Sequence, residues 1–380
     1  MRKKLMPYLV FGGASILVGI LIYIEISINP GGNKKNETGT PLGSDESFNG
    51  GNAGFYRGVL ISSDMVDQKA LQAWKDSGQA VVLFVKDADE STVTAASEIH
   101  KSLGRVEYFF EIARNPELAE AQPHWMASIQ GHPEWMRFYP GFQAAQEKEV
   151  VKVYPWVPVL YREAFDAHIE RLQRDLSELP APSRIWLHDL QGAPSACGCG
   201  HTLCRWTADY GPKKTAATIG DIAAADFTRE VMKLSPGAEV VPILAGECEA
   251  EDKDGPCAGV GCYEGICWKA FSRQLDPLAE VAPLIGASCL YKEYGRDLER
   301  YGAPGQWAGY SVRTFESMPP QRGGKGIPAS RVLALLQGWD VGKEAVDAQW
   351  EAIEKAGAAG GLISLTPIVQ DWEPKKIPLP

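Results

Sequence analysis

The chain has 380 residues, of which 45% are hydrophobic and 23% are charged, a composition typical of globular proteins. The formal net charge of −10 argues against a dedicated nucleic-acid binder, because nucleic-acid phosphates call for a basic protein face. Three regions differ in composition: 1–29, 30–53 and 54–380. The last of these has the length expected of a single α/β barrel domain.

The first region has the pattern of a signal-anchor. Arg2, Lys3 and Lys4 precede an apolar run over residues 5–28 in which Glu25 is the only charged residue. About 20 apolar residues span a bilayer, and flanking basic residues stay on the cytoplasmic side. We therefore expect a transmembrane helix at 5–28, with a cleaved signal peptide as the alternative. Either way, the remainder is expected to be extracytoplasmic, in the periplasm or at the cell surface.

The second region, 30–53, is rich in Gly, Asn, Ser and Lys and is expected to be a flexible linker. From residue 54 onward, short β-rich runs alternate with amphipathic helices. Strands are expected at 56–62, 80–85, 105–112, 184–189, 239–244, 284–291, 332–339 and 361–367. Helices are expected at 69–76, 90–103, 162–178, 219–234, 268–282 and 343–356, with a short one at 297–301 and a long loop at 113–158.

Continuous apolar strands separated by helices indicate a parallel sheet that is covered on both faces. Eight such units predict a closed (β/α)₈ TIM-type barrel, and an open doubly wound sheet is the alternative. No Gly-rich phosphate loop follows the first expected strand, so nucleotide binding is not expected.

Barrel enzymes place their active sites where the strands end. Polar residues at the expected strand ends are Asp64, Lys86, Asp87, Glu111, His188, Asp189, Glu247, Lys292, Glu293 and Asp340. Glycoside hydrolysis needs two carboxyl groups that flank one bond. Asp189, together with Glu247 or Asp340, could supply them. In the alternative interpretation, these carboxylates cap the helices that follow.

The expected loop after the third strand is long and aromatic. Loops of this length are usually functional, and aromatic rings can stack on sugar faces, although they can equally pack the loop onto the barrel. The residues expected to bind substrate are Glu111, His124, Trp125, Trp135, Trp156, His188, Lys292 and Trp339.

The cysteines all lie between residues 197 and 289, namely Cys197, Cys199, Cys204, Cys248, Cys257, Cys262, Cys267 and Cys289. An even number in an exported chain favours disulfides, which would fix two long neighbouring loops. A structural zinc site is the alternative, although the C-x-C-x₄-C spacing is not that of a standard zinc knuckle. No other cofactor is expected.

Several segments carry a family resemblance. They are HPEW at 132–135, YPWV at 154–157, the expected helix 162–178, WLHDLQG at 186–192 and CGCGHTLCRWTADYG at 197–211. Together they resemble glycoside-hydrolase-like (β/α)₈ barrel proteins with a C-x-C-x(n)-C-R loop after the fourth strand. The resemblance implies a sugar-handling barrel with Asp189 at the acidic position of that strand. Many of those proteins have an acidic pair, whereas this chain has His188 beside Asp189.

Three functional hypotheses follow from these patterns. The first is a glycoside hydrolase that acts on an extracytoplasmic carbohydrate with two carboxylates. The second is a non-catalytic barrel at the cell surface that binds glycans or a protein partner. The third is a redox or metal protein that uses the cysteines. The separation of the carboxyl groups distinguishes the first two hypotheses.

Overall fold

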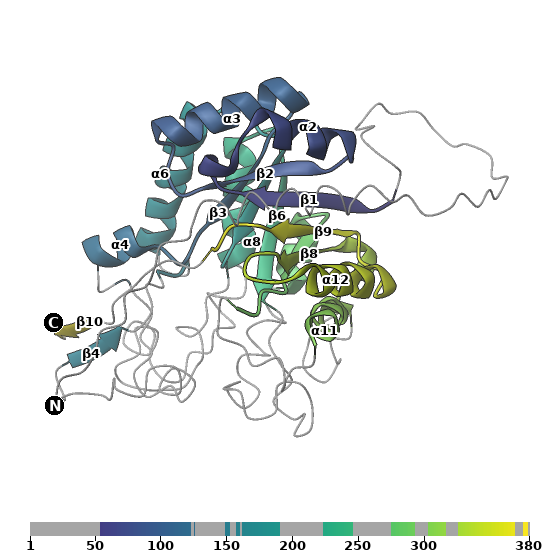
Figure 1. Cartoon of the computed structure of the whole chain (residues 1–380). Helices are drawn as coiled ribbons and strands as arrows, with labels where there is room; N and C mark the ends of the chain where they lie inside the picture. Colours follow the sequence, from purple (N-terminus) through teal and green to yellow (C-terminus); the bar gives the residue numbers. More distant parts are fainter. Residues whose placement is uncertain are drawn as a thin grey trace, which may run out of the picture.

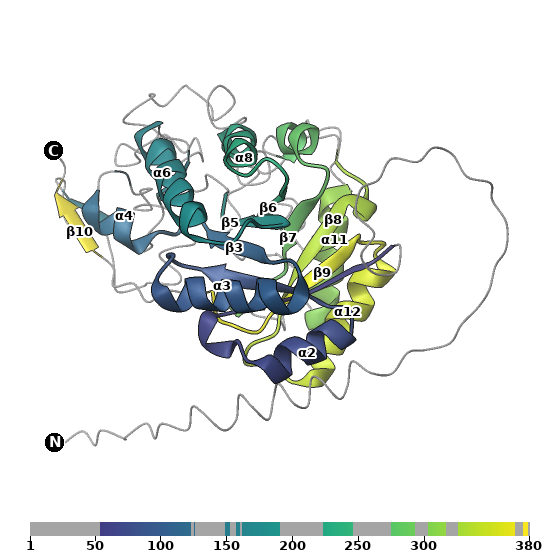
Figure 2. The same cartoon turned by 90° about the horizontal axis from the view of Figure 1, so that it is seen from above.

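The protein is a closed barrel of eight parallel strands surrounded by helices (Figure 1). The computed structural model describes residues 54–122, 125, 149–152, 157–159, 162–190, 223–245, 275–292, 303–316, 326–368 and 375–378. Viewed from above, the helices form a ring outside the strands (Figure 2). The predicted closed barrel is therefore confirmed over the open-sheet alternative.

The barrel strands follow the chain in order around the barrel, and β9 pairs with β1 to close it. They are β1 (Tyr56–Ile61), β2 (Ala80–Val85), β3 (Glu107–Glu111), β5 (Arg184–His188), β6 (Glu239–Ala245), β7 (Ile285–Ser288), β8 (Val332–Gln337) and β9 (Gly360–Ser364). Each of the eight predicted strands is present, with its bounds shifted by no more than a few residues.

The helices connect successive strands. They are α2 (Gln68–Asp76), α3 (Glu90–Leu103), α4 (Pro116–Ala121), α6 (Arg162–Glu178), α8 (Ala223–Leu234), α11 (Pro304–Glu316) and α12 (Lys343–Lys355), with a further helical segment at 275–281 and two short 3₁₀ helices, η1 (Ser63–Met65) and η5 (Ala329–Arg331). Sequence capping signals set several ends. The side chain of Asp89, for example, accepts a hydrogen bond from the Thr92 backbone N–H, and Gly104 ends α3 in the left-handed conformation.

The structure corrects two sequence predictions. The helix after β7 is α11, thirteen residues long, whereas the predicted short helix at 297–301 lies outside the described residues. The segment 113–158, predicted to be a loop, contains α4 and a short strand, β4 (Glu149–Lys152). This strand pairs antiparallel with β10 (Lys375–Pro378), and the pair lies beside α4 in Figure 1.

Alternation along the strands divides the core into two layers. Residues such as Leu60, Phe109 and Trp186 form one buried cluster inside the barrel. Their neighbours, such as Ile61 and Phe110, pack in a larger cluster with the helices. Because side chains alternate between the two faces of a strand, a residue two positions from an interior residue also faces the interior.

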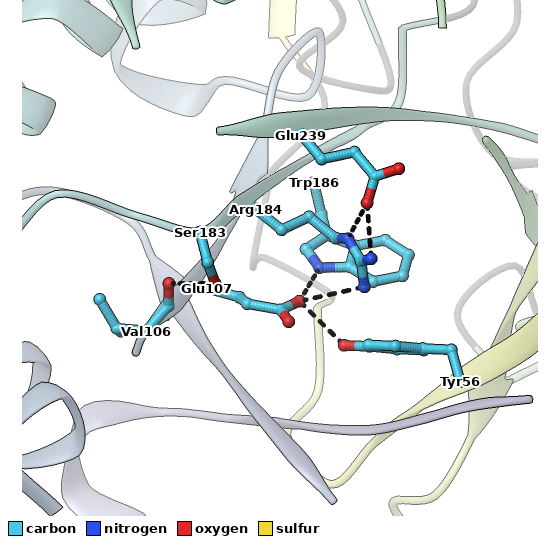
Figure 3. A network of polar contacts seen from close by, with 7 residues as sticks. All are labelled: Tyr56, Val106, Glu107, Ser183, Arg184, Trp186 and Glu239. Atoms are coloured by element: carbon cyan, nitrogen blue, oxygen red, sulfur yellow. Dashed lines mark hydrogen bonds and ion pairs between the residues drawn. The ribbon is translucent and has the colours of Figure 1, made fainter. Parts of the chain in front are cut away.

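The amino-terminal end of the barrel is closed by a network of charged and aromatic groups (Figure 3). Glu107 Oε2 accepts hydrogen bonds from Tyr56 OH at 2.9 Å and Trp186 Nε1 at 3.0 Å, and lies 3.6 Å from Arg184 Nη1. Arg184 Nε in turn donates to Glu239 Oε2 at 2.8 Å. A buried charge needs such partners, so we interpret this network as structural.

The membrane prediction concerns residues outside this description. No helix in the described part of the chain is both long and apolar enough to cross a bilayer. Residues 1–53, which contain the predicted transmembrane helix at 5–28 and the linker, lie outside the described residues.

Barrel closure yields a first prediction. A Cβ at Gly360, where φ is +147°, would lie 2.1 Å from the Tyr56 carbonyl oxygen in the seam between β9 and β1. We expect Gly360→Ala to lower the free energy of unfolding by about 3 kcal/mol. Gly342→Ala is the matched control, because φ there is −80° and a Cβ would meet nothing within 4 Å. Thermal unfolding of both variants checks this, and equal melting temperatures would contradict it.

Candidate functional site

The carboxyl-terminal end of the barrel interior is polar, in contrast to its apolar middle. The last inward-facing side chains of five strands are buried polar groups: Glu111, His188, Ser288, Gln337 and Ser364. Each lies two residues beyond an inward-facing residue of the same strand, such as Phe109, Trp186 or Leu335. Polar groups are costly inside a barrel, so their concentration at the end where barrel enzymes do their chemistry marks a candidate site.

The charged part of this site is built on two neighbouring strands. Glu111 ends β3 and His188 ends β5, and the two residues are direct partners in the sheet register. His188 Nδ1 lies 2.9 Å from Glu111 Oε2, and both side chains are 2% exposed. The His188 ring is tilted against Phe109, with 5.4 Å between ring centroids. The imidazole is thus held by a carboxylate on one side and an aromatic ring on another.

Two arginines support the glutamate. Arg171 of α6 donates from Nη2 to the Glu111 carbonyl oxygen at 2.6 Å, and Arg114 is buried just beyond β3. Burial on its own would raise the pKa of Glu111. Its interactions with His188, Arg114 and Arg171, including the hydrogen bond from His188, outweigh that effect and lower this pKa below its ordinary value. Glu111 is therefore an ionised, buried carboxylate.

Asp189 occupies a strained backbone position next to this pair. Its φ is +58°, a left-handed conformation that is uncommon for residues other than glycine. In an extended strand, Asp189 would point away from the face that His188 occupies. The left-handed turn instead leaves its buried carboxyl electrostatically coupled to Glu111, Arg114 and His188. Such strain concentrates at functional sites.

The carboxyl group of Asp189 is set up to hold a proton. Burial raises its pKa to about 7, and the negative charge of Glu111 adds to this rise. Interactions with Arg114 and His188 and a hydrogen bond from the Arg114 backbone oppose the shift without cancelling it. Oδ2 of Asp189 is buried and has no hydrogen-bond partner among the residues that the structure describes. One ionised carboxylate beside one protonated carboxyl group is an arrangement suited to proton transfer near neutral pH.

The other side of the barrel end is neutral. Gln337 Nε2 donates to the Trp339 carbonyl at 3.0 Å, and its Oε1 accepts from the Lys292 backbone N–H at 3.3 Å. Ser364 Oγ donates to the Thr366 carbonyl at 2.7 Å. These groups fix the loops that leave β8 and β9, and they provide no charge.

Three further predicted site residues lie beyond β7 and β8. Asp340 is exposed and, like Asp189, has a positive φ, of +53°. Lys292 is exposed, and its Nζ donates to the Asp340 carbonyl oxygen. Trp339 is 9% exposed and belongs to the cluster inside the barrel. Asp189 and Asp340 are the two residues other than glycine with positive φ in the described part of the chain.

Of the predicted loop residues, the structure describes Trp125. This residue is partly buried and packs against a small cluster formed by Ala119, Val157 and Ala164. Other predictions fall outside the described residues, namely Glu247, His124, Trp135, Trp156, Cys197, Cys199, Cys204, Cys248, Cys257, Cys262 and Cys267. They stay predictions.

Cys289 differs from the expectation of a disulfide or a metal ligand. Its side chain is buried in the layer between the barrel and the helices, and its thiol donates to the carbonyl oxygens of Ala287 at 3.5 Å and Ala308 at 3.9 Å. It therefore acts as a small core residue. Within the described ranges, no group of three or more His, Cys, Asp or Glu side chains could hold a metal ion.

Glu111, His188 and Asp189 were expected at the site because all three lie at or near the ends of predicted strands. Arg114 and Arg171 were not expected there. Arg114 follows Glu111 by three residues in the same segment, which is a usable signal. Arg171 is distant in sequence and reaches the site through α6, so the sequence carries no sign of it.

The chain is similar to several solved structures, at low sequence identity. No family model and no curated protein matches the chain. Among solved structures, a β-galactosidase from the psychrophilic Marinomonas ef1 is 10% identical with a TM-score of 0.44, covering 81% of this chain and 54% of that one. An endo-1,4-β-D-mannanase from Thermotoga petrophila RKU-1 is 10% identical with a TM-score of 0.44, covering 82% and 88%. Xylanase 10B from Thermotoga maritima is 7% identical with a TM-score of 0.35, covering 82% and 83%.

This chain thus spans about half the length of the β-galactosidase. At these TM-scores the likenesses carry no weight for activity.

The raised pKa of Asp189 predicts how stability depends on pH. The folded state has a pKa of about 7 at this position and the unfolded state has the ordinary value of 3.8, so between these pH values the folded state binds more protons. Stability is therefore lost as the pH rises from about 4 to 7. Asp189→Asn imitates the protonated form. We expect it to gain stability relative to the wild type over this window, by up to about 4 kcal/mol, with no further change above it.

Denaturant unfolding of both proteins at a series of pH values measures this gap. Asp340→Asn is the matched control, since it removes one exposed carboxylate from the same left-handed backbone conformation. Parallel pH profiles of the wild type and Asp189→Asn would show that Asp189 does not titrate as described.

Proposed function

We propose that the protein is a glycoside hydrolase in which Asp189 is the general acid. The observation that most supports this is the buried carboxyl group of Asp189, with a pKa of about 7, at the carboxyl-terminal end of a closed barrel beside the ionised Glu111. The sequence resemblance to glycoside-hydrolase-like barrel proteins implies the same position for the acidic residue of this strand.

The chemistry follows from the protonation state. In glycoside hydrolysis, one carboxylic acid protonates the leaving oxygen as the C–O bond to the anomeric carbon breaks. Asp189 holds a proton near neutral pH, where an ordinary aspartate is ionised. A general acid works best when its pKa lies near the operating pH. Glu111 is unsuited to the same role, because its pKa is lowered.

The second carboxylate, as nucleophile or base, is proposed to be Glu247 after β6 or Asp340 after β8. Asp340 is exposed at the same end of the barrel, and its left-handed backbone repeats the feature found at Asp189. The carbohydrate-binding surface is proposed to include His124, Trp125, Trp135, Trp156, His188, Lys292 and Trp339. The cysteines of the loops after β5 and β6 are proposed to staple those loops.

The proposed setting is extracytoplasmic, with the barrel held to a membrane through residues 5–28. Three basic residues followed by a long apolar run support this placement. An acidic domain on a polar linker fits an exported, surface-held enzyme.

One observation favours a second candidate, a barrel that binds glycans without cleaving them. Asp189 is 8% exposed and Glu111 and His188 are each 2% exposed, so the charged groups are nearly closed off from solvent. A turnover experiment separates the two candidates.

The proposed acid predicts a specific loss of activity. On a panel of aryl glycosides, Asp189→Asn should lower kcat by about 10²–10⁴-fold for substrates with poor leaving groups, because these need a proton on the departing oxygen. Substrates with good leaving groups should lose much less. Wild-type activity should decline as the pH rises through about 7, as the acid loses its proton.

The control is Asp76→Asn. Asp76 is an exposed carboxylate at the end of α2, just before β2, and so lies at the opposite end of the barrel. It should leave kcat unchanged. Glycoside cleavage that Asp189→Asn leaves intact would remove Asp189 from the mechanism, whereas binding of glycans without any turnover in the wild type would favour the second candidate.

A further inference from the structure

The Glu111–His188 pair has a geometry that the general-acid proposal does not use. The two residues meet at 2.9 Å with both side chains 2% exposed, so water competes little for this hydrogen bond. The sheet register fixes their backbones opposite one another on neighbouring strands. The Phe109 ring, 5.4 Å away, limits rotation of the imidazole. The orientation of the His188 imidazole relative to the Glu111 carboxylate is therefore fixed.

The hydrogen bond also defines where the imidazole carries its proton. The positive charges of Arg114 and Arg171 beside β3 favour the ionised form of Glu111, and an ionised carboxylate can only accept a hydrogen bond. Nδ1 of His188 must therefore be the donor. In a neutral imidazole the other nitrogen, Nε2, is then an acceptor with a free lone pair.

Among the described residues, none hydrogen-bonds to Nε2 of His188. Nε2 is also absent from the buried side-chain atoms that lack a hydrogen-bond partner. His188 is the last inward-facing residue of β5, following Arg184 and Trp186 on the same face. Nε2 thus belongs to the end of the barrel interior where Asp189 lies.

We propose that Glu111 is a positioning residue that holds His188 with Nδ1 protonated, so that Nε2 accepts a hydrogen bond from a sugar hydroxyl next to the bond being cleaved. This rests on the proposed function for the identity of the ligand, but the tautomer itself does not. A fixed acceptor selects a substrate hydroxyl, because a site built to receive one rejects analogues that lack it.

His168 provides an internal reference of the opposite kind. It is fully buried on α6, and its Nε2 lies 2.8 Å from the Val157 carbonyl oxygen, so Nε2 must carry the proton. Burial lowers its pKa to about 3, with the nearby charge of Arg171 adding to this, which keeps the ring neutral at ordinary pH. The same molecule therefore contains one imidazole expected in each tautomer.

The experiment is ¹⁵N NMR of the histidine rings in the full chain at neutral pH, with signals assigned by His188→Gln and His168→Gln. The chain has six histidines, so the spectrum is simple. We expect a protonated Nδ1 and a bare Nε2 for His188, and the reverse for His168. In Glu111→Gln, whose amide can donate as well as accept, His188 should become a mixture of tautomers while His168 stays unchanged.

Activity supplies the second readout. If the wild type cleaves an aryl glycoside, Glu111→Gln should lower kcat/KM by about tenfold to a hundredfold, the value of one well-placed hydrogen bond. The loss should be smaller for the deoxy analogue that lacks the contacted hydroxyl. A wild-type His188 with its proton on Nε2 would overturn the positioning role whatever the activity. An unchanged tautomer and unchanged kcat/KM in Glu111→Gln would do the same.

These results separate the two proposals. The expected tautomers together with no glycoside turnover in any protein would leave the oriented pair standing and overturn the hydrolase function. Turnover that depends on Asp189 but not on Glu111 would leave the hydrolase and remove the positioning residue.

Discussion

An unpaired charge is strongly unfavourable inside a closed barrel. This constraint distinguishes the glutamate of β3 that has a structural role from the one at the candidate site. Glu107 and Glu111 face inward from opposite ends of β3, four residues apart. Glu107 accepts from Tyr56 and Trp186 and lies against Arg184, so its partners are complete (Figure 3). Glu111 has one oxygen in contact with His188, and its other oxygen has no partner within the described part of the chain. The first glutamate helps to close the amino-terminal end of the barrel. The second has an oxygen that could accept a hydrogen bond from a ligand or bind a proton.

Asp189 shows how backbone geometry completes such a site. A regular strand would turn its side chain toward the helices, whereas the left-handed residue leaves its carboxyl coupled to the Glu111 charge. The cost of that conformation, of order 1–3 kcal/mol for most residues, is lower for aspartate. Burial and a like charge then hold the proton. The strained backbone and the raised pKa thus occur at the same residue, at the end of two neighbouring strands that each carry a carboxyl group.

The fold was largely readable from sequence because its strands are apolar and continuous. The run AVVLFV at 80–85 is β2 in full, and Asp89 and Gly104 bracket α3 as their capping preferences predict. Helix α11 was missed because Gly305 and Gly309 weaken its helical signal. Gly305 is needed where α11 approaches α12, because a Cβ there would lie 2.6 Å from the Ala348 carbonyl oxygen. The strand ends pointed to Glu111, His188 and Asp189, but the φ of Asp189 and the reach of Arg171 depend on tertiary structure that periodicity does not encode.

The pairing of β4 with β10 has a consequence for how the molecule is made. Residues 375–378 join a segment at 149–152 that emerges from the ribosome much earlier. The pairing of β1 with β9 likewise cannot form until β9 has been synthesised. Both closures demand contacts between distant parts of the chain, which fold slowly. Until β9 and β10 have been synthesised, the partly made barrel therefore exposes the unpaired edges of β1 and β4, and unpaired strand edges are prone to aggregation.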